Sequence, residues 1–221
     1  MQYPVKLAVA VTLCPERPKM AVGEKREILL GSRQEVLLTG SGGQGLILAA
    51  IILAEAAVND NKNVVQTQSY GPEARGGASM AGVIIDVDTI EYPKVASPTV
   101  LLCMSDAAFR KYLPRVAPGG LVIVDSTFVH GPYPKDFNIY AYPITRMARE
   151  KLGREVVANM VALALINAAC CLVSRDILKE SILQRSPRGS GEINLQAFEL
   201  GYRLYEQGLE SDWGLSAQIP Q

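Results

Sequence analysis

The sequence predicts an α/β protein with a Rossmann-like, mostly parallel sheet, helices on the faces of the sheet and further helices at the C-terminus. Short apolar runs of strand length alternate with helical segments, which is the order expected of parallel strands joined by helices. A glycine-rich turn joins the first apolar run to the first helix. The 221 residues are enough for one domain of ordinary size and an extra segment.

Six short segments are predicted to be strands, because they are largely apolar and end at glycine, proline or polar turn residues. They are residues 35–39, 64–69, 78–86, 99–105, 121–126 and 138–144. Asp125 and Ser126, at the end of one strand, could face a ligand, but a strand-end cap or turn is the simpler interpretation.

Helices are predicted between and after these strands, at residues 43–58, 106–113, 145–152, 156–174, 176–185 and 192–208. The segment 156–174 is apolar nearly all round, so we expect the sheet or a partner to bury it. Asn159 lies near the start of this segment and Asn167 lies inside it. A buried asparagine needs hydrogen-bond partners, which a neighbouring subunit could supply, but an amide satisfied within the core is the simpler interpretation.

The chain is predicted to consist of an N-terminal extension (1–34), one domain (35–210) and a C-terminal tail (211–221). The extension contains Pro4, Pro15 and Pro18 and has a weak apolar pattern. Its apolar stretch is too short to span a membrane and lacks the cleavage pattern of a signal peptide. We therefore expect a cytoplasmic protein that does not associate with membranes.

Charge and cysteine content disfavour two classes of function. Lys and Arg number 22, as do Asp and Glu, so the formal net charge is zero and there is no basic excess for nucleic acid. The four cysteines contain no C-x-x-C pair, and the chain has one histidine. A zinc or iron–sulfur site built from this chain alone is therefore not expected, and the cysteines are interpreted as buried thiols in a reducing compartment.

The first candidate site is the turn TGSGGQG, residues 39–45. Its glycines at 40, 42 and 45 have the G-x-G-x-x-G spacing of dinucleotide-binding loops. Glycine lets a ligand approach the backbone closely, and the following helix directs its free N–H groups toward that ligand. The turn is therefore expected to bind a phosphate or a carboxylate group. The strand at 64–69 ends without the acid that holds a ribose, which disfavours NAD and FAD. A turn with no ligand remains an alternative.

The second candidate site is the loop within QTQSYGPEARGGASMAG, residues 66–82. Proline and glycine can give this loop a defined shape. Arg75 offers a planar fork of donors that suits carboxylate or phosphate. The alternative is that Glu73 and Arg75 are solvated surface charges.

Four motifs together resemble the gamma subunit of 2-oxoacid:ferredoxin oxidoreductases, over residues 35–206. They are GSGGQG, QSYGPEARGG, VIIDVDTIEYPKV and GGLVIVDS. The sequence QTQSYGPEARGG and the later IEYP are most similar to the 2-oxoglutarate branch, and the pyruvate and branched-chain branches are close alternatives. The domain 35–210 is accordingly expected to be of this gamma type.

The resemblance implies a subunit that supports CoA-dependent oxidative decarboxylation of a 2-oxoacid, with electrons passed to ferredoxin. It implies no catalytic residue in this chain. By position in the matching motifs, it implies that Ser41, Gly42, Gly43, Gln44, Gly45 and Arg75 contribute to the CoA site and that Tyr70, Glu73 and Gly76 contact another subunit.

The resemblance also implies partners: alpha and beta subunits, with a small ferredoxin-like delta subunit as a further candidate. Thiamine diphosphate, Mg and iron–sulfur clusters are expected on these partners, so the chain alone should be inactive. Two alternatives remain from the residues themselves. One is a stand-alone NAD- or FAD-dependent oxidoreductase, and the other is a structural subunit whose loops serve only packing.

Overall fold

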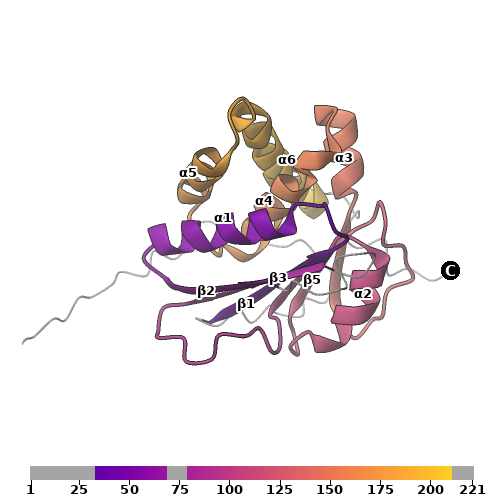
Figure 1. Cartoon of the computed structure of the whole chain (residues 1–221). Helices are drawn as coiled ribbons and strands as arrows, with labels where there is room; N and C mark the ends of the chain where they lie inside the picture. Colours follow the sequence, from indigo (N-terminus) through magenta and orange to yellow (C-terminus); the bar gives the residue numbers. More distant parts are fainter. Residues whose placement is uncertain (1–32, 69–78, 211–221) are drawn as a thin grey trace, which may run out of the picture.

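The computed structural model describes residues 33–68 and 79–210 (Figure 1). Its strands are β1 (Gln34–Gly40), β2 (Asn63–Gln68), β3 (Ser79–Asp86), β4 (Val100–Cys103), β5 (Leu121–Asp125) and β6 (Asn138–Tyr142). Its helices are α1 (Leu46–Asn59), α2 (Asp106–Tyr112), α3 (Ile144–Leu152), α4 (Ala158–Cys170), α5 (Arg175–Arg185) and α6 (Gly191–Glu210), with 3-10 turns η2 (Leu113–Arg115) and η3 (Glu155–Val157). The described part of the chain contains no helix that is long and apolar enough to cross a membrane.

The strands form one sheet in the order β2-β3-β1-β4-β5-β6. The pairs β1–β4, β4–β5 and β5–β6 are parallel, whereas β3 is antiparallel to both of its neighbours, β1 and β2. The prediction of a mostly parallel α/β sheet is confirmed, but the reversed β3 was not predicted. Only residues 69–78 join β2 to β3, and this is shorter than the crossover that a parallel pair requires.

The strand directions bring several chain segments to one edge of the sheet. Since β1, β2, β4, β5 and β6 run the same way, their carboxyl ends meet at this edge, where β3 begins. Gly40 at the end of β1 pairs with Ser79, and Gln68 at the end of β2 pairs with Ala81. The residues that flank 69–78 therefore lie at the same edge as the turn that follows β1.

The two faces of the sheet are covered unequally. On the helix-rich face, α1, α3, α4, α5 and α6 pack over the larger of the two hydrophobic cores. On the helix-poor face, α2, η2 and the loops around Val95 and Val129 cover a smaller core. Figure 1 shows α1, α4, α5 and α6 above the sheet and α2 on its other side.

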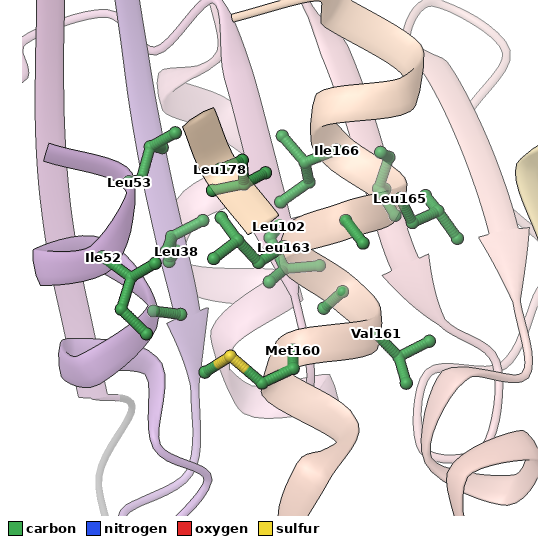
Figure 2. Close-up of a cluster of buried hydrophobic side chains, with 14 of the residues drawn as sticks. Leu38, Ile52, Leu53, Leu102, Met160, Val161, Leu163, Leu165, Ile166 and Leu178 are labelled. Carbon is green, nitrogen blue, oxygen red and sulfur yellow. The ribbon is translucent and has the colours of Figure 1, made fainter. Parts of the chain in front are cut away.

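Helix α4 lies at the centre of the helix-rich face, between the sheet and the outer helices. Every residue of α4 except Ala169 is buried, which confirms the burial predicted for this segment. Figure 2 shows Met160 and Leu163 of α4 directed toward α1 and the strands, near Leu38 and Leu102. The helix ends at Cys170 rather than at residue 174, because Cys171 adopts a left-handed backbone conformation with φ 51°.

Helix α6 covers α4 from the outer side at very short range. A Cβ atom added to Gly201 of α6 would overlap the carbonyl oxygen of Val161 and lie 2.7 Å from Cβ of Ala164. Glycine at this position therefore lets the two helix backbones touch.

Candidate functional site

The glycine loop, residues 41–45, connects the end of β1 to the start of α1. Ser41, Gly42 and Gly43 are exposed at the carboxyl edge of the sheet. Gly43 has φ +88° and Gly45 has φ +70°, a conformation that residues with a side chain rarely adopt. The two glycines therefore set the path of the loop, and the helix begins at residue 46 rather than at 43 as predicted.

Gln44 ties the inner side of the glycine loop to neighbouring backbone. Its Oε1 accepts a hydrogen bond from the N–H of Ser41 at 2.7 Å, and its Nε2 donates to the carbonyl oxygen of Met104 at 2.9 Å. A Cβ atom on Gly40 would overlap Oε1 of Gln44, so the side chain fills the space beneath the loop. Both polar atoms of Gln44 thus contact the protein, and its contact with a coenzyme stays a prediction.

Asn159, in the first turn of α4, contacts the glycine loop from the helix-rich face. Its Nδ2 donates to the carbonyl oxygen of Gly45 at 3.1 Å. A Cβ atom on Gly45 would lie 2.5 Å from the same nitrogen. The sequence predicted that the amide would find partners, but nothing in the local pattern identified the glycine loop as the partner.

The outer side of the loop is suited to an anion. Helix α1 starts without a side-chain cap and has no acidic residue in its first turn, so the partial positive charge of its N-terminus is not offset there. A Cβ atom on Gly43 would meet no described atom within 4 Å, so none of the described residues covers the backbone at this point. Phosphate and carboxylate are the groups that such an arrangement of N–H donors accepts.

Asp125, at the end of β5, has a structural role at the same edge. The carboxylate is fully buried, and its two oxygens accept hydrogen bonds from the N–H groups of Thr127 (3.0 Å) and Thr145 (3.1 Å). It therefore joins the end of β5 to the start of α3, which confirms the interpretation of this residue as a strand-end cap.

Cys103 lies at the end of β4, one strand from the glycine loop. Burial raises the pKa of its thiol to about 12, and a weak hydrogen bond from Oγ1 of Thr39, at 3.5 Å, only partly offsets this. A thiol with this pKa stays protonated at neutral pH and is a poor nucleophile.

The strand order differs from that of a dinucleotide-binding sheet. In such a sheet the second strand lies beside the first and ends in an acid that holds the ribose. Here β3 separates β2 from β1, and the described residues of β2, Asn63–Gln68, include no acid. The G-x-G-x-x-G spacing thus occurs without the other features of an NAD or FAD site.

The second predicted loop cannot be compared with the structure. Tyr70, Glu73, Arg75 and Gly76 lie outside the described residues, so their roles stay predictions. The strand residues on either side of this segment are at the carboxyl edge, as is the glycine loop.

Comparison with known proteins gives consistent matches over most of the chain. Residues 35–204 match the family described as pyruvate ferredoxin/flavodoxin oxidoreductase. The chain is 44% identical over 178 residues to 2-oxoglutarate synthase subunit KorC of Methanocaldococcus jannaschii, a match covering 79% of this chain and 95% of the relative. It is 30% identical over 178 residues to pyruvate synthase subunit PorC of Methanothermobacter thermautotrophicus, covering 78% and 96%.

Two solved structures have the same fold. The gamma subunit of keto/oxoacid ferredoxin oxidoreductase from Geobacter sulfurreducens is 39% identical with a TM-score of 0.71, covering 79% of this chain and 99% of that one. A 2-oxoglutarate:ferredoxin oxidoreductase from Magnetococcus marinus, with 2-oxoglutarate, coenzyme A and succinyl-CoA bound, is 20% identical with a TM-score of 0.72. That match covers 80% of this chain and 32% of the longer chain, and it shows the fold alone.

Proposed function

The chain belongs to the pyruvate ferredoxin/flavodoxin oxidoreductase family, and we propose that it is the gamma subunit of a 2-oxoglutarate:ferredoxin oxidoreductase. One observation carries the choice of 2-oxoglutarate. At nearly equal coverage, identity to a 2-oxoglutarate synthase subunit is 44%, whereas identity to a pyruvate synthase subunit is 30%. The sequence of the motif in residues 66–82 favours the same branch.

The reaction of the assembled enzyme would convert 2-oxoglutarate and CoA to succinyl-CoA and CO2. The bond between C1 and C2 of the oxoacid breaks, and C1 leaves as CO2. The thiol sulfur of CoA forms the new bond to C2, and one proton is released. The two electrons that remain reduce two molecules of ferredoxin.

We propose that the glycine loop supplies part of the CoA site. The exposed backbone of Ser41, Gly42 and Gly43 and the uncapped start of α1 suit a phosphate group, and CoA carries three phosphates. Arg75 is proposed as a further contact, because a guanidinium can bind a phosphate through two hydrogen bonds. The chain's contribution would be to bind and orient CoA rather than to transfer protons or electrons.

We propose that thiamine diphosphate, Mg and the iron–sulfur clusters bind to alpha and beta partner subunits, with a ferredoxin-like delta subunit as a further candidate. The four cysteines of this chain include no C-x-x-C pair, which supports this division. Tyr70, Glu73 and Gly76 are proposed to contact a partner, and ferredoxin would be the electron acceptor. In the Magnetococcus enzyme the matching region is about a third of a longer chain, so this fold is joined there to further parts of the same enzyme, which supports the proposal of partner subunits.

Co-purification and substrate comparison test this proposal. The tagged chain should co-purify with partner subunits from native cells, and the complex should reduce ferredoxin with 2-oxoglutarate only when CoA is present. Pyruvate and 2-oxoisovalerate should react much more slowly. Faster turnover of pyruvate would assign the chain to that branch instead. An isolated chain that binds NADH or FAD saturably would contradict the proposal altogether.

The role of the glycine loop is tested by Gly43→Ala in the assembled complex. The methyl group would project into the open space before the loop, so the KM for CoA should rise about tenfold or more, the effect of one lost charge-assisted hydrogen bond. Gly119→Ala is the matched control, since Gly119 has φ +78° and equally open surroundings but precedes β5 at the opposite edge of the sheet. If both variants keep the wild-type KM for CoA, the loop does not bind it.

A further inference from the structure

We infer that Asn159 is a positioning residue, which holds the glycine loop in the conformation that binds CoA. Its side chain contacts the carbonyl oxygen of Gly45 rather than the exposed residues 41–43. This inference rests on the proposed function of the loop. Asn159 is 5% exposed and stands 114 residues from Gly45 in sequence, yet its amide reaches the Gly45 carbonyl.

The acceptor of this hydrogen bond is the group that starts α1. The carbonyl oxygen of Gly45 also accepts the N–H of Ala49 at 3.1 Å, the first hydrogen bond of the helix. Asn159 therefore fixes the peptide unit between residues 45 and 46. That unit sets the direction of the first free N–H groups of α1, which are those that an anion would meet.

The environment of Asn159 indicates that this contact is specific. Helix α4 is otherwise apolar apart from Asn167, and a buried amide is costly unless its groups are hydrogen-bonded. Oδ1 of Asn159 accepts the N–H of Met160 at 2.9 Å, and Nδ2 donates to Gly45. Both ends of the side chain are thus engaged, which fixes its orientation.

Gln44 holds the same loop from another direction. It links the N–H of Ser41 to the carbonyl of Met104, which lies between β4 and Ser105, the N-cap of α2. Asn159 anchors the loop to α4 and Gln44 anchors it to the β4–α2 junction. Residues 42 and 43, which lie between these anchors, remain exposed and available to a ligand.

Asn167 provides an internal control in the same helix. It is 2% exposed, its Nδ2 donates to Val173 O (3.0 Å) and Tyr202 Oη (2.9 Å), and its Oδ1 accepts Val173 N–H (3.0 Å). It thus has the same chemistry and similar burial, but it connects α4 to the following turn and to α6. Replacing either amide should destabilise the chain, whereas only Asn159 acts on the glycine loop.

The experiment compares Asn159→Ala with Asn167→Ala in the assembled complex. We expect Asn159→Ala to raise the KM for CoA about fivefold, the scale of one hydrogen bond, with kcat within about twofold of wild type. Asn167→Ala should lower the melting temperature and leave the KM for CoA unchanged. Amide hydrogen exchange in residues 41–48 should accelerate only in Asn159→Ala.

A second variant separates the hydrogen bond from the space that the side chain fills. Asn159→Leu keeps a similar side-chain shape but has no donor for Gly45 and adds no charge, so it should raise the KM for CoA as much as alanine does. This variant also serves if Asn159→Ala does not accumulate. A wild-type KM in Asn159→Leu, or equal KM shifts in Asn159→Ala and Asn167→Ala, would overturn the positioning role. A wild-type complex that turns over without CoA would instead overturn the proposed function.

Discussion

Each face of the sheet is covered by a hydrophobic core, but the elements that cover the two faces differ. On the helix-rich face, α1, α3, α4, α5 and α6 bury a core that includes nearly all of α4. On the helix-poor face, α2, η2 and loops cover a smaller core. The glycine loop belongs to neither core. Asn159 holds it from α4, and Gln44 holds it to the β4–α2 junction. The larger core thus lies on the helix-rich face, whereas the glycine loop is fixed by individual hydrogen bonds to α4 and to the β4–α2 junction.

The sharpest test of this contrast compares two phenylalanines. Phe198 on α6 is 0% exposed within the helix-rich core, whereas Phe109 on α2 is 9% exposed and meets the ring of Tyr133 edge-on at 5.8 Å. We expect Phe198→Ala to lower the free energy of unfolding by about 4 kcal/mol, because closely packed helices cannot collapse into the cavity. Phe109→Ala should cost about 2 kcal/mol, since the neighbouring loops can partly fill the space.

Urea unfolding of the full chain measures both values. Phe198→Leu serves as a control, because it keeps much of the volume and should fall between wild type and Phe198→Ala. Equal losses for Phe198→Ala and Phe109→Ala would show that the helix-poor face contributes as much as the helix-rich face.

A smaller change in the free energy of unfolding is expected from ionisation of Cys103, the buried thiol of the helix-poor core. Burial raises the pKa of Cys103 from its ordinary value of 9.0 to about 12. The unfolded chain therefore loses this proton first, so the contribution to stability is complete below pH 9 and is lost as pH rises toward 12. At pH 10.5 the loss should be about 2 kcal/mol, since each unit above the unfolded pKa is worth about 1.4 kcal/mol.

Unfolding experiments at pH 8.5 and pH 10.5 check this expectation. Cys103→Ala should lose less stability between the two pH values than wild type does. Burial also raises the pKa of Cys170 on the helix-rich face, so Cys170→Ala should change the alkaline profile in the same direction. An unchanged profile in Cys103→Ala would indicate that water reaches this thiol in the folded protein.

The smallest change in stability is expected from an exposed ion pair on the outer side of the helix-rich face. Arg185 of α5 and Glu55 of α1 form an ion pair, with Nε of Arg185 donating to Oε2 of Glu55 at 2.7 Å. Both side chains are substantially exposed, so solvent screens their interaction. Arg185→Ala should leave the melting temperature unchanged within error, in low and in high salt. A clear loss that disappears in high salt would mean that this pair helps to hold α5 on α1.

Most of the fold could be predicted from the sequence because its signals are local. Aliphatic runs, turn residues and helical periodicity located the strands and helices to within a few residues. The direction of β3 required a different argument. The segment between β2 and β3 is too short to contain a crossover helix, and applying this length limit to residues 69–78 would have predicted the antiparallel strand.

The candidate site could be predicted only in part. The glycine spacing identified the loop, but the side chains that hold it act over long distances in sequence. Asn159 and Gly45 are 114 residues apart, and Gln44 and Met104 are 60 apart. Periodicity and spacing describe neighbours along the chain, so they could show that Asn159 needs a partner but not which group it binds. The roles of residues in the second loop stay predictions.

The contact at Gly201 constrains how this domain can diverge. Because a side chain at position 201 would meet backbone atoms of α4 as well as Ala164, a smaller residue at position 164 would not make room for it. Homologous subunits that carry a larger residue at 201 are therefore expected to have a displaced last helix. The residue at this position would indicate how closely the last helix packs on α4 in each homologue.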